Sequence, residues 1–216
     1  SKIGRRTGMI SKDLIDKYKH WKENTFNNNK ESFEKLATEG QFPEYMFISC
    51  VDSRVDPNSI FNAKAGELFV HRNIANLIPS YNHLPEHSGT IAAIEFGVCS
   101  LGIKNLIVMG HSSCGGIKNG FHLCSNNNFD DEASAISRWL KILQPAYEKI
   151  IGTNDQEKIS CLEKLSIINS IENLKKYPFI DEGIESDTLN ICGIWNDIGS
   201  GEIHSYNEKT KSFEKV

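Results

Sequence analysis

Four short apolar runs, separated by longer stretches with helical periodicity, constrain the fold more than any other feature of this sequence. The runs cover residues 45–48, 68–70, 106–109 and 189–192, and the helical stretches cover 89–100, 132–143 and 156–175. Near-continuous apolarity over a strand length is typical of parallel strands that are covered on both faces. The alternation therefore predicts an α/β fold with a mostly parallel central β-sheet flanked by helices.

The first forty residues show a different pattern and predict an N-terminal helical arm. Ser11 is placed to cap a helix whose apolar residues recur at 10, 14, 18 and 21, and a second short helix over 31–38 ends at Gly40. We expect the arm over residues 1–40 and an α/β domain over 41–216. The apolar face of the arm fits either packing on its own domain or clasping a partner subunit.

Composition argues against several kinds of partner. The chain has 216 residues and a formal net charge of -4, so no basic surplus exists to neutralise nucleic-acid phosphates or an anionic membrane. No apolar stretch approaches the ~20 residues that span a bilayer, and no secretory signal is visible. The chain has six cysteines, but it is long enough to form a hydrophobic core that does not need disulfide bonds. We therefore expect these cysteines to be reduced. These features predict a cytoplasmic protein with no nucleic-acid or membrane partner.

Two short motifs follow two of the predicted strands directly. Cys50-Val-Asp-Ser-Arg54 follows the strand at 45–49, and His111-Ser-Ser-Cys114-Gly-Gly116 follows the strand at 106–110. In an open parallel sheet, ligands bind outside the carboxyl ends of the strands. Neighbouring strands would therefore bring Cys50, His111 and Cys114 to one point.

Two thiolates and one imidazole are donors that suit Zn²⁺. Structural zinc sites usually have four protein ligands, whereas three ligands leave a position for water or substrate. No fourth Cys or His lies beside either motif. The set Cys50, His111 and Cys114 therefore predicts a catalytic site with one zinc ion per subunit. The glycine at Gly116 would allow backbone to approach the metal or the substrate closely.

Asp52 and Arg54 add a second part to this predicted site. A carboxylate beside zinc can accept a hydrogen bond from a bound hydroxide and so aim its lone pair at a substrate, provided that the carboxylate stays ionised. Arg54 offers a planar fork that pairs with a carboxylate through two hydrogen bonds and favours its charged form. The simpler interpretation of Asp52 and Arg54 is a surface salt bridge that contributes little to stability. The position next to Cys50, at a strand end, favours the catalytic one.

Three stretches in this order resemble the β-class carbonic anhydrases, in particular their plant-like branch. They are Cys50-Val-Asp-Ser-Arg54, Gly66-Glu-Leu-Phe-Val-His-Arg-Asn-Ile-Ala-Asn76 and Gly110-His-Ser-Ser-Cys-Gly-Gly116. The resemblance implies reversible hydration of carbon dioxide to bicarbonate and a proton by a zinc-bound hydroxide. It implies Cys50, His111 and Cys114 as zinc ligands with the Asp52–Arg54 dyad beside the metal. It also implies a homodimer or homotetramer with active sites near the subunit interface and the arm wrapped over the neighbour.

The same resemblance implies a set of substrate-binding residues. Gln41 falls where the plant-like branch has a glutamine that donates to bound substrate. Phe69, Ile74 and Phe96 match an apolar wall around the carbon dioxide site, and Gly116 gives close access to it. Phe96 stands where a tyrosine is often found, so a hydrogen bond from that hydroxyl is lost.

One branch of the family is inhibited by bicarbonate, and its site is incomplete in this sequence. Phe47 occupies the place of a tryptophan, and no later tyrosine can be matched, although Arg72 of that site is present. We therefore do not expect inhibition by bicarbonate.

Two other functions remain compatible with these motifs. The same fold and metal can act on a related substrate such as carbon disulfide, depending on access to the metal. Alternatively, the chain is a non-catalytic zinc module used for assembly, which would need a fourth protein ligand such as Asp52.

Overall fold

The computed structural model describes residues 7–129 and 134–216. The chain divides into two compact units, one that ends at Gln41 and one that covers Phe42–Val216.

The N-terminal unit is helical, as its apolar periodicity predicts. It consists of α1 (Lys12–Trp21), a π-helical segment η1 (Lys22–Phe26) and α2 (Lys30–Glu39). Ser11 caps α1 by accepting a hydrogen bond from the Leu14 amide at 3.3 Å. Gly40 ends α2 with a φ of 87°, a conformation that glycine adopts without strain. Helical structure thus continues past Trp21 to Phe26 before α2 begins at Lys30.

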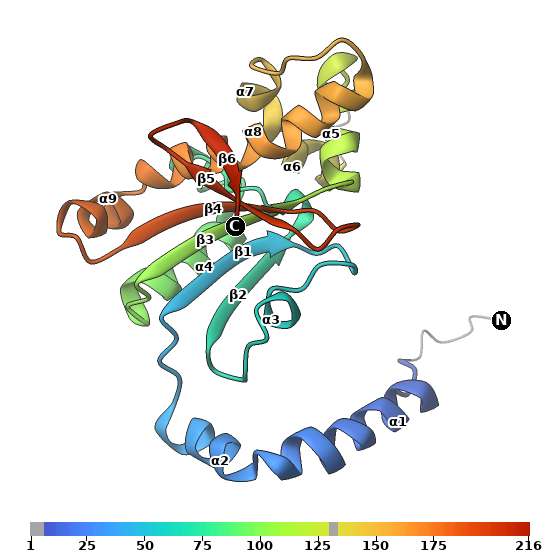
Figure 1. Cartoon of the computed structure of the whole chain (residues 1–216), viewed down its shortest axis with the longest axis vertical. Coiled ribbons are helices and arrows are strands. Elements are labelled where there is room, and N and C mark those ends of the chain that lie inside the picture. Colours follow the sequence, from blue (N-terminus) through green and yellow to red (C-terminus); the bar gives the residue numbers. More distant parts are fainter. Residues whose placement is uncertain (1–6, 130–133) are drawn as a thin grey trace. The chain divides into compact units, whose positions relative to one another are not determined.

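The second unit is built on a six-stranded sheet (Figure 1). The strands are β1 (Tyr45–Cys50), β2 (Leu68–Asn73), β3 (Asn105–His111), β4 (Asn190–Asn196), β5 (Ile203–Asn207) and β6 (Ser212–Lys215). Their order is β2-β1-β3-β4-β5-β6. The first four are parallel, and β5 and β6 are antiparallel. The predicted α/β fold with a mostly parallel sheet is confirmed, and the C-terminal pair of strands is an addition to it.

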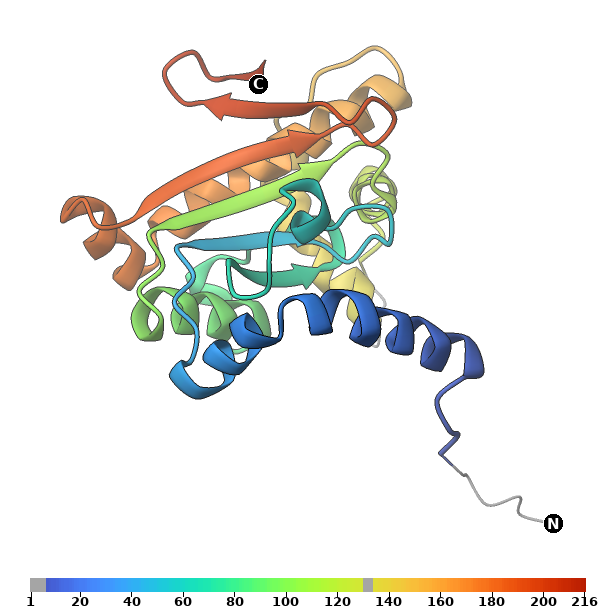
Figure 2. The same cartoon turned by 60° about the horizontal axis from the view of Figure 1, so that its bottom comes forward.

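One face of the sheet carries a continuous hydrophobic core. Met46, Ile48, Leu106 and Val108 project from β1 and β3 on this face. They pack against residues of α4 (Ser88–Glu95) and α8 (Asp155–Lys175), and α9 (Pro178–Glu185) lies at the end of the same layer. Figure 2 shows α8 behind the strands. The helices predicted at 89–100 and 156–175 are therefore those that cover this face.

Further helices surround the carboxyl ends of the strands and the edges of the sheet. They are α3 (Pro57–Ile60), η2 (Ile74–Asn76), η3 (Tyr81–His83), η4 (Phe96–Ser100), α5 (Gly115–Ser125), α6 (Ala135–Leu140), η5 (Lys141–Leu143) and α7 (Gln144–Tyr147). The helix predicted over 132–143 corresponds to α6 and η5, and its first two positions lie outside the described residues. The helices α5 and α9 were not predicted. Among the described residues, no helix combines the length and apolarity needed to cross a membrane.

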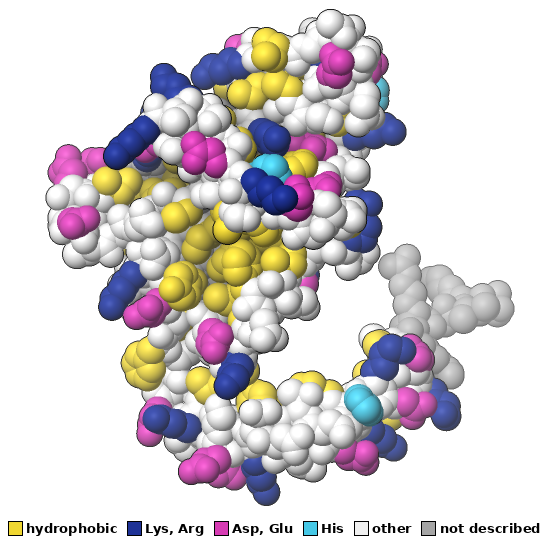
Figure 3. Space-filling view, in the orientation of Figure 1, with side chains coloured by type: hydrophobic (Ala, Val, Ile, Leu, Met, Phe, Trp, Pro, Cys, Tyr) yellow, Lys and Arg dark blue, Asp and Glu magenta, His cyan; other side chains and the backbone are white. Residues whose placement is uncertain are grey.

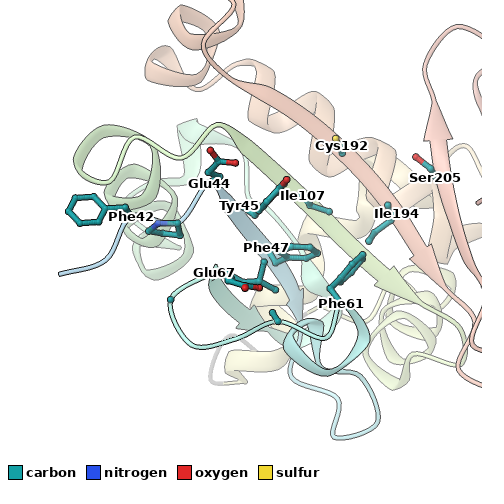
Figure 4. Close-up of a pocket in the computed structure, with 14 residues that line it drawn as sticks. Phe42, Glu44, Tyr45, Phe47, Phe61, Glu67, Ile107, Cys192, Ile194 and Ser205 are labelled. Atoms are coloured by element: carbon teal, nitrogen blue, oxygen red, sulfur yellow. The ribbon is translucent and has the colours of Figure 1, made fainter. Parts of the chain in front are cut away.

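The opposite face of the sheet is only partly covered. Hydrophobic side chains gather there in an open hollow (Figure 3). A cavity of about 680 Å³ crosses this face, with Phe47, Phe61, Ile107 and Ile194 among its lining residues (Figure 4). Phe47 and Phe61 pack against each other with ring centroids 5.2 Å apart. This unit therefore exposes an apolar groove, which we call the sheet groove.

Candidate metal centre

Three metal-ligating side chains meet at the carboxyl ends of two adjacent strands. Cys50 is the last residue of β1, and His111 is the last residue of β3. Cys114 precedes α5, and the turn that leads to it contains Ser113 with a φ of 54°. The ligand atoms of Cys50, His111 and Cys114 all lie within 4.8 Å of one another. The parallel register thus brings together the donors that the sequence places at strand ends.

The imidazole of His111 is oriented toward this cluster by its own loop. Its Nδ1 atom lies 2.8 Å from the carbonyl oxygen of Ser112. A carbonyl only accepts, so Nδ1 carries the proton and Nε2 presents a lone pair. The ring is 2 % exposed, and Nε2 has no hydrogen-bond partner among the described residues. A buried acceptor without a partner is costly, and a metal ion would satisfy it.

The two thiols are buried and free. The Ala75 amide donates to Cys50 Sγ at 3.3 Å. Hydrogen bonding from the Cys114 thiol holds the pKa of Cys50 well below its ordinary value, although burial opposes the shift. The same contact, together with burial, raises the pKa of Cys114. In the absence of a cation the site therefore favours one thiolate, and a divalent cation would stabilise both.

Asp52 and Arg54 form the ion pair that the sequence predicts beside this cluster. Arg54 Nε donates to Asp52 Oδ1 at 3.0 Å and Nη2 donates to Oδ2 at 2.7 Å, so the pair is bidentate. The Arg54 guanidinium holds the pKa of the Asp52 carboxyl well below its usual range. Asp52 Oδ2 lies 3.9 Å from His111 Nε2. The carboxylate is thus ionised and adjacent to the unpaired ring nitrogen.

The residues predicted to bind substrate fall into two groups. Ile74 and Gly116 lie beside the cluster: a Cβ built on Gly116 would stand 2.8 Å from Ile74 Cγ2. Phe69 and Phe96 pack against each other with centroids 6.0 Å apart, at the opposite end of the sheet. Phe69 pairs with Met46 of β1, four residues from Cys50, or about 13 Å along a strand. Gln41 belongs to the N-terminal unit, so its predicted contact with substrate stays a prediction.

Two residues near the centre were not predicted from the sequence. Trp139 of α6 donates from Nε1 to the Ile74 carbonyl at 2.8 Å. Glu163 of α8 is buried and lies within reach of Trp195 Nε1 at 3.4 Å. Burial raises the pKa of Glu163. A glutamate inside the apolar stripe of a predicted helix is the signal that would have singled it out.

A family comparison now decides what kind of protein carries this centre. The family model described as carbonic anhydrase matches residues 45–203, which hold all three donors and the Asp52–Arg54 pair. A carbonic anhydrase of Helicobacter pylori strain J99 is 36 % identical over 201 residues, covering 91 % of this chain and 90 % of the relative. The chain belongs to the β-carbonic anhydrase family.

Solved structures agree with this assignment. The β-carbonic anhydrase CcaA superposes with a TM-score of 0.84 at 31 % identity, over 94 % of this chain and 98 % of that one. A tetrameric β-carbonic anhydrase from the ascomycete Sordaria macrospora gives a TM-score of 0.75 at 30 % identity, over 89 % and 94 %. The predicted resemblance to the β-class carbonic anhydrases is therefore confirmed.

Zinc is the metal that β-carbonic anhydrases use, and the cluster in this chain fits it. Two sulfur donors and one imidazole nitrogen are a preferred zinc set. The unpaired Nε2 of His111 and the depressed pKa of Cys50 are the properties expected of residues prepared for a cation. The described residues contribute three donors to the cluster, which leaves a fourth position for water or substrate.

Proposed function

We propose that this β-carbonic anhydrase hydrates carbon dioxide reversibly to bicarbonate and a proton. The observation that carries the proposal is the Cys50–His111–Cys114 cluster with the ionised Asp52 beside it, within a chain of this family. When bound, zinc acts as a Lewis acid and supplies an activated water for attack on carbon dioxide. The remaining steps depend on the residues of this chain.

We assign Cys50, His111 and Cys114 to metal binding, and the Asp52–Arg54 pair to orienting the nucleophile. Asp52 would accept a hydrogen bond from the activated water through a carboxylate oxygen and so orient the oxygen lone pair toward the substrate carbon. Arg54 keeps Asp52 ionised and holds it in one rotamer through two hydrogen bonds. The side chain of Ile74 supplies an apolar contact for carbon dioxide. Gly116 leaves room for the substrate, because any side chain there would collide with Ile74.

The two alternative functions are supported less well. A non-catalytic zinc module needs a fourth protein ligand, but the described donors number three and Asp52 is engaged by Arg54. Action on carbon disulfide would keep the same metal centre, and no contact of this structure favours it over carbon dioxide.

We also propose that the enzyme acts as a homo-oligomer, a dimer or tetramer, in which Phe69 and Phe96 complete the site of a neighbouring subunit. In one chain Phe69 lies about 13 Å along the sheet from Cys50, and the Phe96 ring packs against Phe69. Phe96 is nevertheless 50 % exposed, which is unusual for a ring this large outside an interface. Assembly through this region would place the rings of one copy against the metal centre of another.

Two exposed apolar surfaces support assembly. The N-terminal unit has no buried residue in its described helices, and it exposes Leu14, Tyr18 and Trp21. The second unit exposes the sheet groove. Contact with a second copy would remove such surfaces from water, and the S. macrospora relative is a tetramer.

Stopped-flow measurement of carbon dioxide hydration tests the activity. The purified protein is assayed as isolated, after zinc removal with a chelator, and after zinc is added back. Activity should vanish with the metal and return with it. Cys114→Ser should lose both zinc and activity, whereas Cys99→Ser, at an exposed thiol outside the cluster, should keep both. Zinc-loaded protein that does not accelerate hydration would refute the proposed function.

A further inference from the structure

Arg72 lies on β2 and turns its guanidinium onto the loop that follows β1. Its Nε atom donates to the carbonyl of Cys50 at 2.8 Å, and its Nη2 atom donates to the carbonyls of Asp52 and Val55 at 2.7 and 2.6 Å. These acceptors span the loop from the last residue of β1 to Val55. One planar cation therefore holds the beginning, the middle and the end of the loop.

Arg54 also holds this loop through its contacts with Asp52 and with the Ser113 carbonyl, and two backbone hydrogen bonds add to them. The Val51 amide donates to the Asn73 carbonyl at 2.9 Å, and the Val55 amide closes a turn onto the Asp52 carbonyl at 3.2 Å. The Val55 side chain is buried, but those of Val51 and Arg54 are exposed. Packing therefore anchors one end of the loop, and hydrogen bonds must hold the segment that carries the dyad.

We propose that Arg72 is a positioning residue, which sets the Cys50 thiolate and the Asp52 carboxylate relative to His111 by fixing the carbonyls of their own residues. The guanidinium suits this role because its donors diverge in a rigid plane and stay charged. Lysine would offer one compact charge on a flexible stem and cannot satisfy three separated carbonyls in the same way. The inference rests on the proposed function only for its catalytic consequence.

A merely structural role makes a different prediction. If Arg72 only adds hydrogen bonds to the fold, its loss lowers the unfolding midpoint and leaves the metal loop unchanged in the folded protein. Tyr177→Phe is a matched control for that case. It removes a buried hydroxyl that donates to the Pro79 carbonyl at 2.7 Å, in a part of the unit distant in sequence from both metal motifs.

The test compares the wild-type holoenzyme with Arg72→Lys and Tyr177→Phe. Three properties are measured: amide hydrogen exchange of residues 51–56, the rate of zinc transfer to an excess of chelator, and kcat and KM for carbon dioxide. Unfolding midpoints are recorded for all three proteins. If Arg72→Lys does not fold, Arg72→Gln, which keeps a planar donor group, carries the same measurements.

We expect Arg72→Lys to exchange the amides of 51–56 at least tenfold faster and to transfer zinc at least fivefold faster. We expect kcat to fall at least tenfold with KM within threefold. Tyr177→Phe should change none of these more than twofold, even at a similar loss of stability. Exchange and zinc transfer within twofold of wild type in Arg72→Lys would overturn the proposal, as would equal effects of Tyr177→Phe. Amide exchange and zinc transfer can be measured even if the wild-type protein does not hydrate carbon dioxide. A failure of the proposed activity is therefore distinguishable from a failure of the proposed role of Arg72.

Discussion

Arg54 and Ser113, which are 59 residues apart in the sequence, are joined by a hydrogen bond from the Arg54 Nη2 atom to the Ser113 carbonyl at 2.9 Å. The same Nη2 atom also donates to Asp52. Ser113 lies in the turn between His111 and Cys114, so this bond ties the dyad to the loop that carries the other two donors. A small movement of either loop would therefore shift the Asp52 carboxylate.

This link predicts the effect of Arg54→Lys. A lysine ammonium can contact the carboxylate, but it cannot pair with both oxygens and the Ser113 carbonyl at once. We expect kcat for carbon dioxide hydration to fall about tenfold or more, with zinc content unchanged. Lys104→Ala serves as a control, because it removes a surface ion pair with Glu44 and should leave kcat unchanged. An Arg54→Lys enzyme with wild-type kcat would show that the bidentate geometry is dispensable.

Gly116 and Gly115 provide a matched pair of glycines for testing the space beside the metal. A Cβ at Gly116 would lie 2.8 Å from Ile74 Cγ2 and 2.9 Å from the Ala75 Cβ, whereas one at Gly115 would meet nothing within 4 Å. Gly116→Ala should lower the free energy of unfolding by about 1–3 kcal/mol. Gly115→Ala should change it by less than about 0.5 kcal/mol or raise it slightly. Denaturant unfolding of both zinc-loaded variants checks this, and equal effects would contradict the close approach.

The start of α8 predicts a pH-dependent contribution to stability. Glu157 accepts hydrogen bonds from the Thr153 amide and hydroxyl at 2.8 and 2.7 Å, and these bonds lower the pKa of Glu157. A carboxyl whose pKa is lower in the folded state stabilises the fold at pH values above its pKa in the unfolded chain. This stabilisation is lost as the pH falls through the pKa of the folded state. Glu157→Gln should therefore be less stable than wild type at pH 7.

The difference in stability between wild type and Glu157→Gln should become smaller below about pH 4, where the carboxyl of the unfolded chain becomes protonated. Thermal unfolding between pH 7 and pH 3.5 measures it. The exposed Glu185→Gln at the end of α9 is the control and should show no such narrowing. A gap that stays constant over this range would mean that the Thr153 contacts do not stabilise the charged form.

Subunit complementation tests whether Phe96 serves a neighbouring site. Asp52→Asn and Phe96→Asp should each inactivate the homo-oligomer. Co-expression yields mixed dimers in which one of two sites combines a wild-type Asp52 with a wild-type Phe96 from the other chain. We expect activity to recover to about a quarter of the wild-type value. Light scattering verifies the assembly, and absence of recovery in mixed dimers would place both residues in a site within one chain.

The core of the sheet was predictable because it is encoded locally. Residues 46–48 and 106–109 of the apolar runs are buried, and such burial leaves a direct pattern in the sequence. β5 and β6 leave no such pattern, since polar residues such as Ser205 and Asn207 occupy strand positions and their pairing depends on β4. α5 was missed because Gly115, Gly116 and Gly120 weaken its helical signal.

The residue types of the candidate metal centre were also predictable from the sequence. The types and order of Cys50, Asp52, Arg54, His111 and Cys114 at strand ends predicted the cluster of three side chains and the Asp52–Arg54 ion pair that the structure shows. Residue type fixes what a side chain can donate or accept, and strand ends fix which edge it lies on. Neither depends on the details of packing.

Only the tertiary structure decided the distances that link remote segments. It fixed the ring nitrogen that His111 presents, the three carbonyls that Arg72 holds, and the separation of Phe69 from Cys50 along β1. The physical reason is that hydrophobic periodicity is a property of neighbouring residues, whereas strand register and loop packing arise from contacts between segments far apart in the chain. The sequence motifs therefore predicted the three side chains that cluster in the structure, but the register of the sheet determined which predicted wall residues lie near them.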